Sequence, residues 1–149
     1  MQTDSGAPLP SQDERIAGAL AHIGALIPAI CLWIPILIWI TQKDRSRFSG
    51  FQALQAAAFQ LILILATCLA WSCFIGSIFV SFVPLTLNNN SPAWVVDLPL
   101  LISSSVLFLW GLAWLILDLY AILAAVLTFQ GRDFCYLIVG PLVDGFLHR

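Results

Sequence analysis

Apolar residues form four blocks separated by short polar stretches, and the lengths of these blocks predict helices that lie in a membrane. The first three blocks cover residues 16–40, 51–85 and 98–129. A helix needs about 20 predominantly apolar residues to cross a bilayer, so each of these blocks is long enough. The fourth block, residues 134–147, is too short to span and is interrupted by a Gly-Pro pair. We expect it to form a short helix at the membrane interface or packed back on the other helices.

The first block can cross the membrane once or fold back as a hairpin. Gly24, Pro28 and Pro35 interrupt it, and each proline removes a backbone hydrogen-bond donor. A single helix of this length would span the bilayer, whereas a hairpin would consist of two half-length helices. The acidic pair Asp13-Glu14 in front of the block is typical of a helix N-terminus, because the helix dipole favours negative charge there.

Polarity sets the remaining boundaries. Residues 1–15 are rich in proline, serine and glutamine, which predicts an extended polar tail ahead of a single membrane domain, residues 16–149. The second block begins with glutamines among alanines, so residues 51–60 are expected at the interface and residues 61–83 as the span that Pro84 ends. The fold class is therefore all-α integral membrane, a small bundle of about four membrane-embedded helices plus a short C-terminal interfacial helix.

The amino-acid composition agrees with a membrane protein. Hydrophobic residues make up 60% of the chain and charged residues 9%, whereas soluble domains are about half apolar and a quarter charged. The net charge of −2 is too small to indicate a nucleic-acid partner. None of the cysteines stands in a Cys-x-x-Cys pair, which argues against zinc or iron–sulfur centres. The expected partners are the lipid bilayer and other membrane subunits.

The basic residues predict the orientation of the chain. The loop at residues 41–50 carries Lys43, Arg45 and Arg47, whereas the loop at residues 86–97 carries no basic residue. Because cytoplasmic loops carry an excess of lysine and arginine, we expect the first loop in the cytoplasm and the second outside. The three basic residues are the predicted cytoplasmic anchor. The protein is then a multi-pass protein of the bacterial inner membrane with a cytoplasmic C-terminus.

Small and polar residues recur on one face of the third block. Steps of seven residues connect Ser104, Gly111, Asp118 and Ala125. Small residues let membrane helices approach closely, and a carboxylate in lipid costs several kcal/mol. We therefore expect a helix–helix contact with Asp118 hydrogen-bonded inside it. Two alternatives are a proton- or ion-carrying role for Asp118 and an interface shared with Tyr120.

The second block contains two comparable rows of small residues at four-residue steps. One row consists of Cys68, Ser72 and Gly76, and the other of Cys73, Ser77 and Ser81. Residues four apart lie on the same helix face, so both rows predict tight packing against another helix.

His22 is the only histidine within an apolar block. We interpret it as a hydrogen-bonded structural histidine, with Gln60 and Asp118 as candidate partners. The alternative is a haem or pigment ligand; no other cofactor and no metal is expected. The chain contains no His-Glu-x-x-His, P-loop or Gly-x-Ser-x-Gly motif, which predicts a protein that is not an enzyme.

Several short motifs resemble those of the Tic-like translocon family, which comprises a chloroplast inner-envelope import protein and small bacterial relatives of unassigned function. In chain order they are Asp13-Glu14-Arg15, Leu20-Ala21-His22, Trp39-Ile40-Thr41-Gln42-Lys43-Asp44, Phe51-Gln52-Ala53-Leu54-Gln55-Ala56, Phe59-Gln60, Ala124-Ala125 and Gln130-Gly131-Arg132. The resemblance implies a four-helix membrane bundle with both termini in the cytoplasm, which favours the hairpin at residues 16–40. Asp118 and the tail after residue 135 depart from the family's pattern.

Two functions follow from these observations. The first is a non-enzymatic accessory or structural subunit of a larger bacterial membrane complex, whether respiratory, photosynthetic or secretory. The lack of a catalytic set and the two small-residue faces favour it. The alternative is a channel or protein-translocon component in which Asp118, His22 and Gln60 line a polar intramembrane path.

Overall fold

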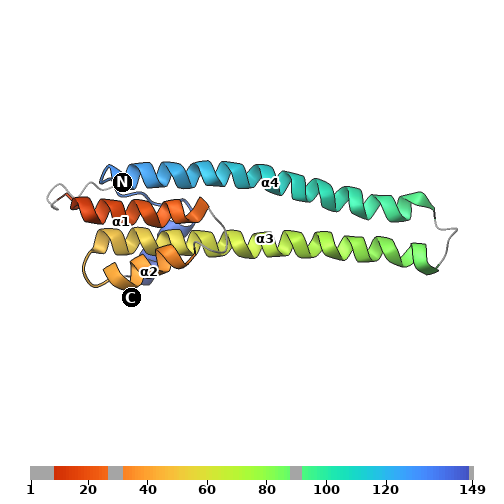
Figure 1. Ribbon diagram of the computed structural model, residues 1–149, viewed down its shortest axis with the longest axis horizontal. Helices are drawn as coiled ribbons and strands as arrows, with labels where there is room; N and C mark the ends of the chain where they lie inside the picture. The colour runs from red at the N-terminus through yellow and green to blue at the C-terminus, as the bar shows by residue number, and fades with distance from the viewer. Residues whose placement is uncertain (1–8, 27–31, 88–91, 148–149) are drawn as a thin grey trace. The chain divides into compact units, whose positions relative to one another are not determined.

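The computed structural model consists of helices joined by short connections (Figure 1) and describes residues 9–26, 32–87 and 92–147. In chain order the elements are α1 (Gln12–Ile23), the 3-10 turn η1 (Gly24–Leu26), α2 (Trp33–Gln42), α3 (Arg47–Leu87), α4 (Ala93–Phe129) and α5 (Val139–Leu147). Since no strand occurs among the described residues, the predicted all-α class is confirmed, while the number of membrane-embedded helices stays a prediction. Pro28 and parts of the predicted polar tail and of the predicted external loop lie outside the described residues.

Helix α1 begins at Gln12 and not at Ile16, where the apolar block starts. The Ser11 hydroxyl accepts a hydrogen bond from the Glu14 backbone N–H at 3.3 Å, and the Glu14 carboxylate accepts one from the Ser11 N–H at 2.6 Å. This reciprocal capping box satisfies donors that the first turn of a helix leaves unpaired. The last four residues of the predicted extended tail are therefore helical, because polar side chains can cap and continue a helix.

The first apolar block forms two helices that contact each other. Figure 1 labels them α1 and α2. Helix α1 ends at Ile23, before Gly24, and α2 begins at Trp33. With 12 and 10 residues, the two helices are about 18 and 15 Å long, too short to cross a bilayer. The single-helix alternative is therefore wrong, and the chain is broken as in the hairpin alternative. The place of this pair in a membrane stays a prediction.

Helices α3 and α4 are long and apolar enough to cross a membrane, through residues Arg47–Val83 and Ala93–Phe129. Helix α3 continues to Leu87, past Pro84, where the span at residues 61–83 was predicted to end. Helix α4 likewise begins ahead of Pro99 and includes it. A proline lacks its own N–H donor and its ring crowds the carbonyl four residues earlier, but the residues around both positions remain helical.

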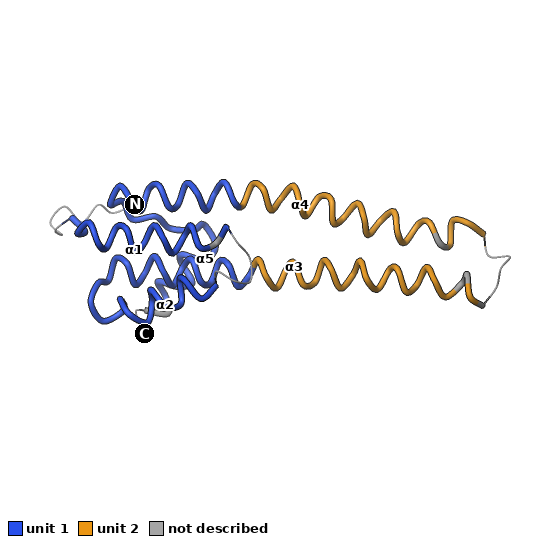
Figure 2. Tube along the Cα trace, viewed as in Figure 1, with its two compact units in different colours: residues 1–62, 118–149 blue, residues 63–117 orange. Residues whose placement is uncertain are grey.

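The chain forms two compact units, coloured separately in Figure 2. Unit 1 comprises residues 1–62 and 118–149, and unit 2 comprises residues 63–117. Unit 1 therefore holds α1, α2, α5, the first part of α3 and the last part of α4. Unit 2 consists of the rest of α3 and α4. The predicted division into a polar tail and a single membrane domain stays a prediction.

Small side chains bring the helices of unit 1 together. Ala21 of α1 packs with Ala53 and Ala56 of α3, and two larger side chains of α2, Ile38 and Trp39, cover this cluster. Alanines allow helix backbones to approach closely, as in many membrane helix pairs. The alanines of the second and fourth motifs, Ala21 beside His22 and Ala53 and Ala56 after Phe51, thus form the α1–α3 contact.

Glycine permits an equally close approach between α1 and α4 in unit 1. A Cβ atom at Gly18 would lie only 2.6 Å from the Thr128 Cγ2 atom. Ala121, Ala124 and Ala125 of α4 are buried in the same unit. Any side chain at Gly18 would therefore push α4 away from α1.

Polar contacts connect α3 and α4 within unit 2. The Ser77 and Ser103 hydroxyl oxygens lie 2.6 Å apart, and the Trp110 indole N–H donates to the Thr67 hydroxyl at 3.3 Å. Large apolar side chains of unit 2 are exposed, among them Leu69, Phe79, Leu101, Phe108, Leu109, Leu115 and Ile116. A two-helix unit with this surface is suited to an apolar surrounding and not to water.

Candidate functional site

Five buried residues from three segments of unit 1 form a polar cluster, which we call the His22 network. It consists of His22 from α1, Gln52 and Gln55 from α3, and Phe134 and Tyr136 from the non-helical segment between α4 and α5. The segment at residues 132–136 is neither helix nor strand. Its buried backbone groups therefore need partners from elsewhere in unit 1.

Both ring nitrogens of His22 are hydrogen-bonded. Its Nε2 atom lies 3.0 Å from the Gln52 Oε1 atom, and its Nδ1 atom lies 3.1 Å from the Tyr136 hydroxyl. The Gln52 amide nitrogen donates to the Phe134 carbonyl at 3.0 Å, which leaves Oε1 to face the histidine. The Gln52 Oε1 atom can only accept, so His22 Nε2–H donates to it. The Tyr136 hydroxyl can donate or accept, and it donates to Nδ1 when the imidazole is neutral.

Gln55 holds the non-helical segment at two backbone positions. Its amide nitrogen donates to the Phe134 carbonyl at 3.0 Å, and its carbonyl oxygen accepts from the Tyr136 N–H at 3.0 Å. One glutamine side chain thus replaces the partners that a neighbouring strand would supply. Together with Gln52, it fixes the return of the chain from α4 to α5.

Aromatic rings enclose the network. The Phe59 ring stacks on the Tyr136 ring with centroids 4.3 Å apart and planes 8° from parallel. Tyr120 of α4 meets the rings of Phe134 and Tyr136 edge to face, with centroids 5.4 and 5.3 Å away. Such pairs add about 0.5–1.5 kcal/mol beyond the area they bury. They also exclude water from the hydrogen bonds of His22.

Burial favours the neutral forms of the two titratable groups in the network. It lowers the pKa of His22 to about 4, and the Gln52 side chain opposes this shift only in part. Burial, followed by the neighbouring Tyr120, raises the pKa of the Tyr136 phenol. Both groups are therefore uncharged at neutral pH, in agreement with the hydrogen bonds between them.

The network does not offer a ligand to haem, pigment or metal. A metal-binding histidine needs one unprotonated ring nitrogen free, whereas both nitrogens of His22 are engaged and the side chain has no exposed surface. In this arrangement His22 offers no free ring nitrogen to haem or a pigment. Within the described residues, no group of three or more His, Cys, Asp or Glu side chains gathers to hold a metal ion.

His22 is a buried structural histidine as expected, but its candidate partners were wrong. The Gln60 amide donates instead to the Gly24 carbonyl at 2.8 Å, at the end of α1. Asp118 cannot bond a His22 nitrogen, because Gln52 and Tyr136 occupy both. Since His22 and Gln60 are buried inside unit 1, they do not line a polar path.

The predicted small-residue faces lie mostly outside the contacts within this chain. Ser104 and Gly111 are exposed, and a Cβ atom at Gly111 would meet nothing within 4 Å. Asp118 is partly exposed, and the buried end of this stripe is Ala125. Other residues of α3 and α4 form the contacts between these two helices, because all the side chains on a helix face together determine how the helix is rotated about its axis. A role of the stripe toward other molecules stays a prediction.

The two small-residue rows of the second block also lie partly outside the contacts within this chain. Ser72 and Gly76 are exposed, and the Ser72 hydroxyl bonds the Cys68 carbonyl of its own helix at 2.7 Å. The other predicted row includes Ser77, which reaches Ser103 of α4, and Ser81, which is buried. Of the two rows, the one with Ser77 therefore faces the partner helix within this chain.

The predicted cytoplasmic anchor lies at the turn from α2 to α3, with Lys43 and Arg45 in the connection and Arg47 as the first residue of α3. Lys43, Arg45 and Arg47 are all exposed, and the Lys43 ammonium lies 5.4 Å from the centre of the Trp39 ring. Exposed cations beside a tryptophan are typical of a membrane boundary. The side of the membrane that they face stays a prediction.

Sequence reasoning missed most of the His22 network. Tyr136 stood in a block expected to form a short helix at the interface or packed back on the other helices, and Gln52 and Gln55 were assigned only to the interfacial start of the second block. The available signal was the spacing of Gln52 and Gln55, which places two amides on one face of an otherwise apolar helix. Such a pair needs buried partners, and a broken helix nearby can supply them.

Comparison with known proteins corrects the assignment by resemblance. No curated protein and no solved structure matches the chain. A family model described as the magnetosome magnetite crystal formation protein family, MamF/MmsF, matches residues 13–143. The assignment to the Tic-like translocon family is therefore wrong. Since the match covers most of the chain, the protein belongs to the magnetosome magnetite crystal formation family.

Proposed function

We propose that this protein is a non-enzymatic, multi-pass protein of the magnetosome membrane that takes part in magnetite crystal formation as an accessory or structural subunit. The observation that carries the proposal is the family match over residues 13–143. It includes α1 to α4 and most of α5, so it covers both compact units.

The surfaces of α3 and α4 support a place in the membrane. In the most apolar windows of these helices, hardly any side chain is buried within the chain itself. Exposed leucine, isoleucine and phenylalanine side chains are costly in water and cost nothing in lipid. The proposed topology keeps the loop at residues 41–50 and the C-terminus in the cytoplasm and the loop at residues 86–97 on the opposite side.

The His22 network supports a structural and not a catalytic role. Its polar groups are paired with one another, uncharged and shielded by aromatic rings. General acid–base catalysis would need a titratable group within reach of a substrate proton. The network is instead suited to hold α1, α3 and the segment before α5 in one arrangement, from which exposed surfaces can bind partner subunits.

The direct test is removal of the gene from a magnetite-forming bacterium, followed by electron microscopy of the crystals. We expect fewer, smaller or misshapen crystals, and restoration by the wild-type gene. Gln55→Leu serves as the folding-defective variant, and Gln130→Leu as the matched control at an exposed position. Crystals of unchanged number, size and shape in the deletion strain would contradict the proposal.

The subunit role has a separate test. The tagged protein is extracted from magnetosome membranes with a mild detergent, sized, and its companions are identified by mass spectrometry. We expect other membrane proteins at fixed stoichiometry. A single chain or a homo-oligomer would contradict the accessory role while leaving the proposed part in crystal formation intact.

A further inference from the structure

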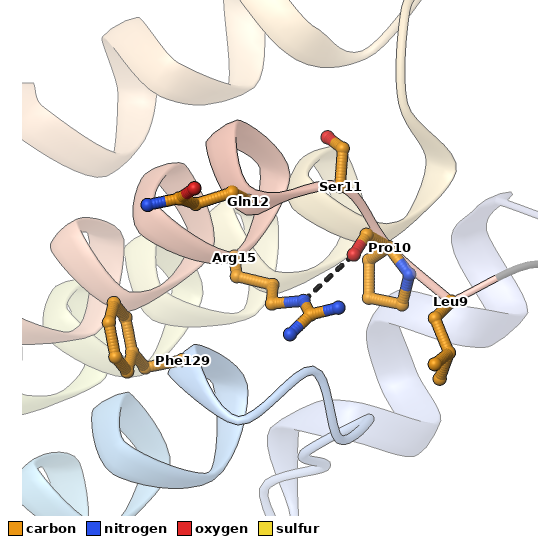
Figure 3. Close-up of a pocket in the computed structure, with 6 residues that line it drawn as sticks. All are labelled: Leu9, Pro10, Ser11, Gln12, Arg15 and Phe129. Atoms are coloured by element: carbon orange, nitrogen blue, oxygen red, sulfur yellow. Dashed lines mark hydrogen bonds between the residues drawn. The ribbon is translucent and has the colours of Figure 1, made fainter.

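A hollow of about 490 Å³ lies in unit 1 where the start of α1 meets the end of α4. Its lining consists of Leu9, Pro10, Ser11, Gln12, Arg15 and Phe129, which Figure 3 draws as sticks. The guanidinium of Arg15 points into the space between Phe129 and Leu9 in that view. The volume is within the range typical of small-molecule sites.

The Arg15 side chain is held in place from two sides. Its Nε atom donates to the Pro10 carbonyl at 2.8 Å. Gly131 lies against the same guanidinium, and a Cβ atom at Gly131 would approach Nε to 3.1 Å. Gly131 also has a φ of 80°, a backbone conformation that residues with side chains rarely adopt. The fork of Arg15 is therefore positioned before any ligand arrives.

The positioned guanidinium has donors to spare. Its side chain makes one hydrogen bond within the described residues, through Nε, so both terminal nitrogens remain for a ligand. The acid next to it in the chain, Glu14, is engaged in the capping box with Ser11. A guanidinium is always charged in proteins, and its planar fork matches two oxygens of a phosphate. The hollow is thus suited to an anion.

The other lining residues indicate what carries the anion. Leu9 is 82% exposed and Phe129 is 57% exposed, and no acidic side chain lines the hollow. Phe129 is also the last residue of the second candidate span. Lipid headgroups lie at the level where an apolar span ends, with the acyl chains beside it. A phospholipid would place its phosphate at Arg15 and apolar carbons against Phe129.

We infer that this hollow is a binding site for the phosphate of an anionic phospholipid, with Arg15 as its bidentate donor. The inference rests on the membrane location proposed above. An anionic headgroup suits the site better than a zwitterionic one, because the lining has no carboxylate to pair with a headgroup amine. Free phosphate shares the same chemistry and is separated from lipid by the experiment.

The test uses the full chain purified in detergent with defined amounts of phosphatidylglycerol, and native mass spectrometry counts the lipids retained. We expect one tightly retained phosphatidylglycerol for the wild type and about tenfold weaker retention for Arg15→Gln, which loses two charge-assisted hydrogen bonds. Arg45→Gln is the matched control, because it removes the same charge from an exposed loop. Its retention should equal that of the wild type.

A second variant changes the position of the Arg15 guanidinium and keeps its charge. Gly131→Ala keeps Arg15 but introduces a Cβ 3.1 Å from its Nε atom, at a backbone φ of 80°, so the guanidinium has to shift from its position. We expect it to weaken retention as Arg15→Gln does, with the helix content by circular dichroism unchanged. Equal retention by wild type, Arg15→Gln and Gly131→Ala would overturn the inference.

Inorganic phosphate forms the other arm of the test. Under the inference, millimolar phosphate does not displace the lipid from the wild type. If phosphate binds at Arg15 and phosphatidylglycerol does not, the lipid assignment is overturned in favour of a soluble anion. Because lipid retention is measured on purified protein, its failure is distinct from an unchanged crystal phenotype in the deletion strain.

Discussion

The two units of this chain keep their helices together in different ways. Unit 1 has a closed set of buried polar groups, in which His22, Gln52 and Gln55 bond each other or the backbone of the segment before α5. Among the described residues of unit 2, the Ser77–Ser103 and Thr67–Trp110 contacts connect the helices, and many large apolar side chains are exposed. The hydrogen bonds within unit 1 therefore fix the arrangement of its segments, whereas the stability of unit 2 depends on the medium around its exposed apolar side chains.

The difference follows from the number of segments each unit has to organise. Unit 1 assembles short helices and a non-helical segment, whose backbone groups must find partners when buried. Unit 2 contains two long helices that satisfy their backbone internally. Apolar burial gives little drive for helix association in lipid, so a few hydroxyl contacts and small residues determine the pairing.

The largest effect is expected from Gln55→Leu, which breaks unit 1 at its central clamp. The variant leaves the buried Tyr136 N–H without its acceptor and removes one donor from the Phe134 carbonyl. We expect the free energy of unfolding to fall by about 3 kcal/mol, measured as a lower thermal midpoint in detergent. The exposed Gln130→Leu should keep the wild-type midpoint. If both variants melt together, the clamp does not stabilise unit 1.

The next effect concerns pH and His22. Its pKa is about 4 in the folded chain against 6.5 when unfolded, so the unfolded state binds the proton first. The stabilisation from neutral His22 is complete above pH 6.5 and declines as the pH falls toward 4. At pH 5 the loss amounts to about 2 kcal/mol. The midpoint should fall between pH 7.5 and 5 by more in the wild type than in His22→Gln; equal shifts would refute this.

A smaller effect is expected from Ser77→Ala in unit 2. Each hydroxyl of the Ser77–Ser103 pair also bonds a carbonyl of its own helix, so little is gained from the contact between helices. Hydrogen bonds between membrane helices contribute about 0.6 kcal/mol on average. We expect a midpoint slightly below that of the matched Ser72→Ala. A loss as large as that of Gln55→Leu would contradict the contrast between the units.

The smallest effect is expected from Gly111→Ala, which adds a methyl group to an open surface of unit 2. The thermal midpoint of the purified chain should stay the same or rise slightly, because alanine favours a helix over glycine by about 1 kcal/mol. Gly18→Ala is the contrast in unit 1, where the methyl group would collide with Thr128. Equal destabilisation by the two substitutions would mean that Gly111 is covered in the folded chain.

The helical class and the long apolar helices could be predicted, because block length and composition are local properties. The break in the first block was also visible, since prolines and Gly24 interrupt it, but the choice between one span and a hairpin was not. That choice depends on contacts between α1, α2 and α3, which involve alanines that carry no distinct signal. The start of α1 was missed because its capping box consists of polar residues ahead of the apolar block.

The site was harder to predict than the fold. His22 could be singled out as buried because it interrupts an apolar run, but its partners are 30 and 114 positions away in the chain. The spacing of apolar residues at 134–147 does not indicate that Tyr136 lies ahead of α5, with its side chain buried in unit 1. For the stripe through Ser104 and Gly111, the sequence indicated a helix face that packs against a partner. Helical spacing identifies such a face but does not identify the molecule that covers it.

The most direct test of the contrast between the units is the surrounding of unit 2 in a bilayer. Spin labels are placed at Leu69 and Leu109, two exposed positions of unit 2, and at Asp44 in the exposed loop, in a chain whose native cysteines are replaced. We expect the unit 2 labels to collide readily with oxygen and rarely with a water-soluble nickel chelate, and the Asp44 label to show the reverse. Nickel collisions at Leu69 and Leu109 that match those at Asp44 would contradict a lipid-embedded unit 2.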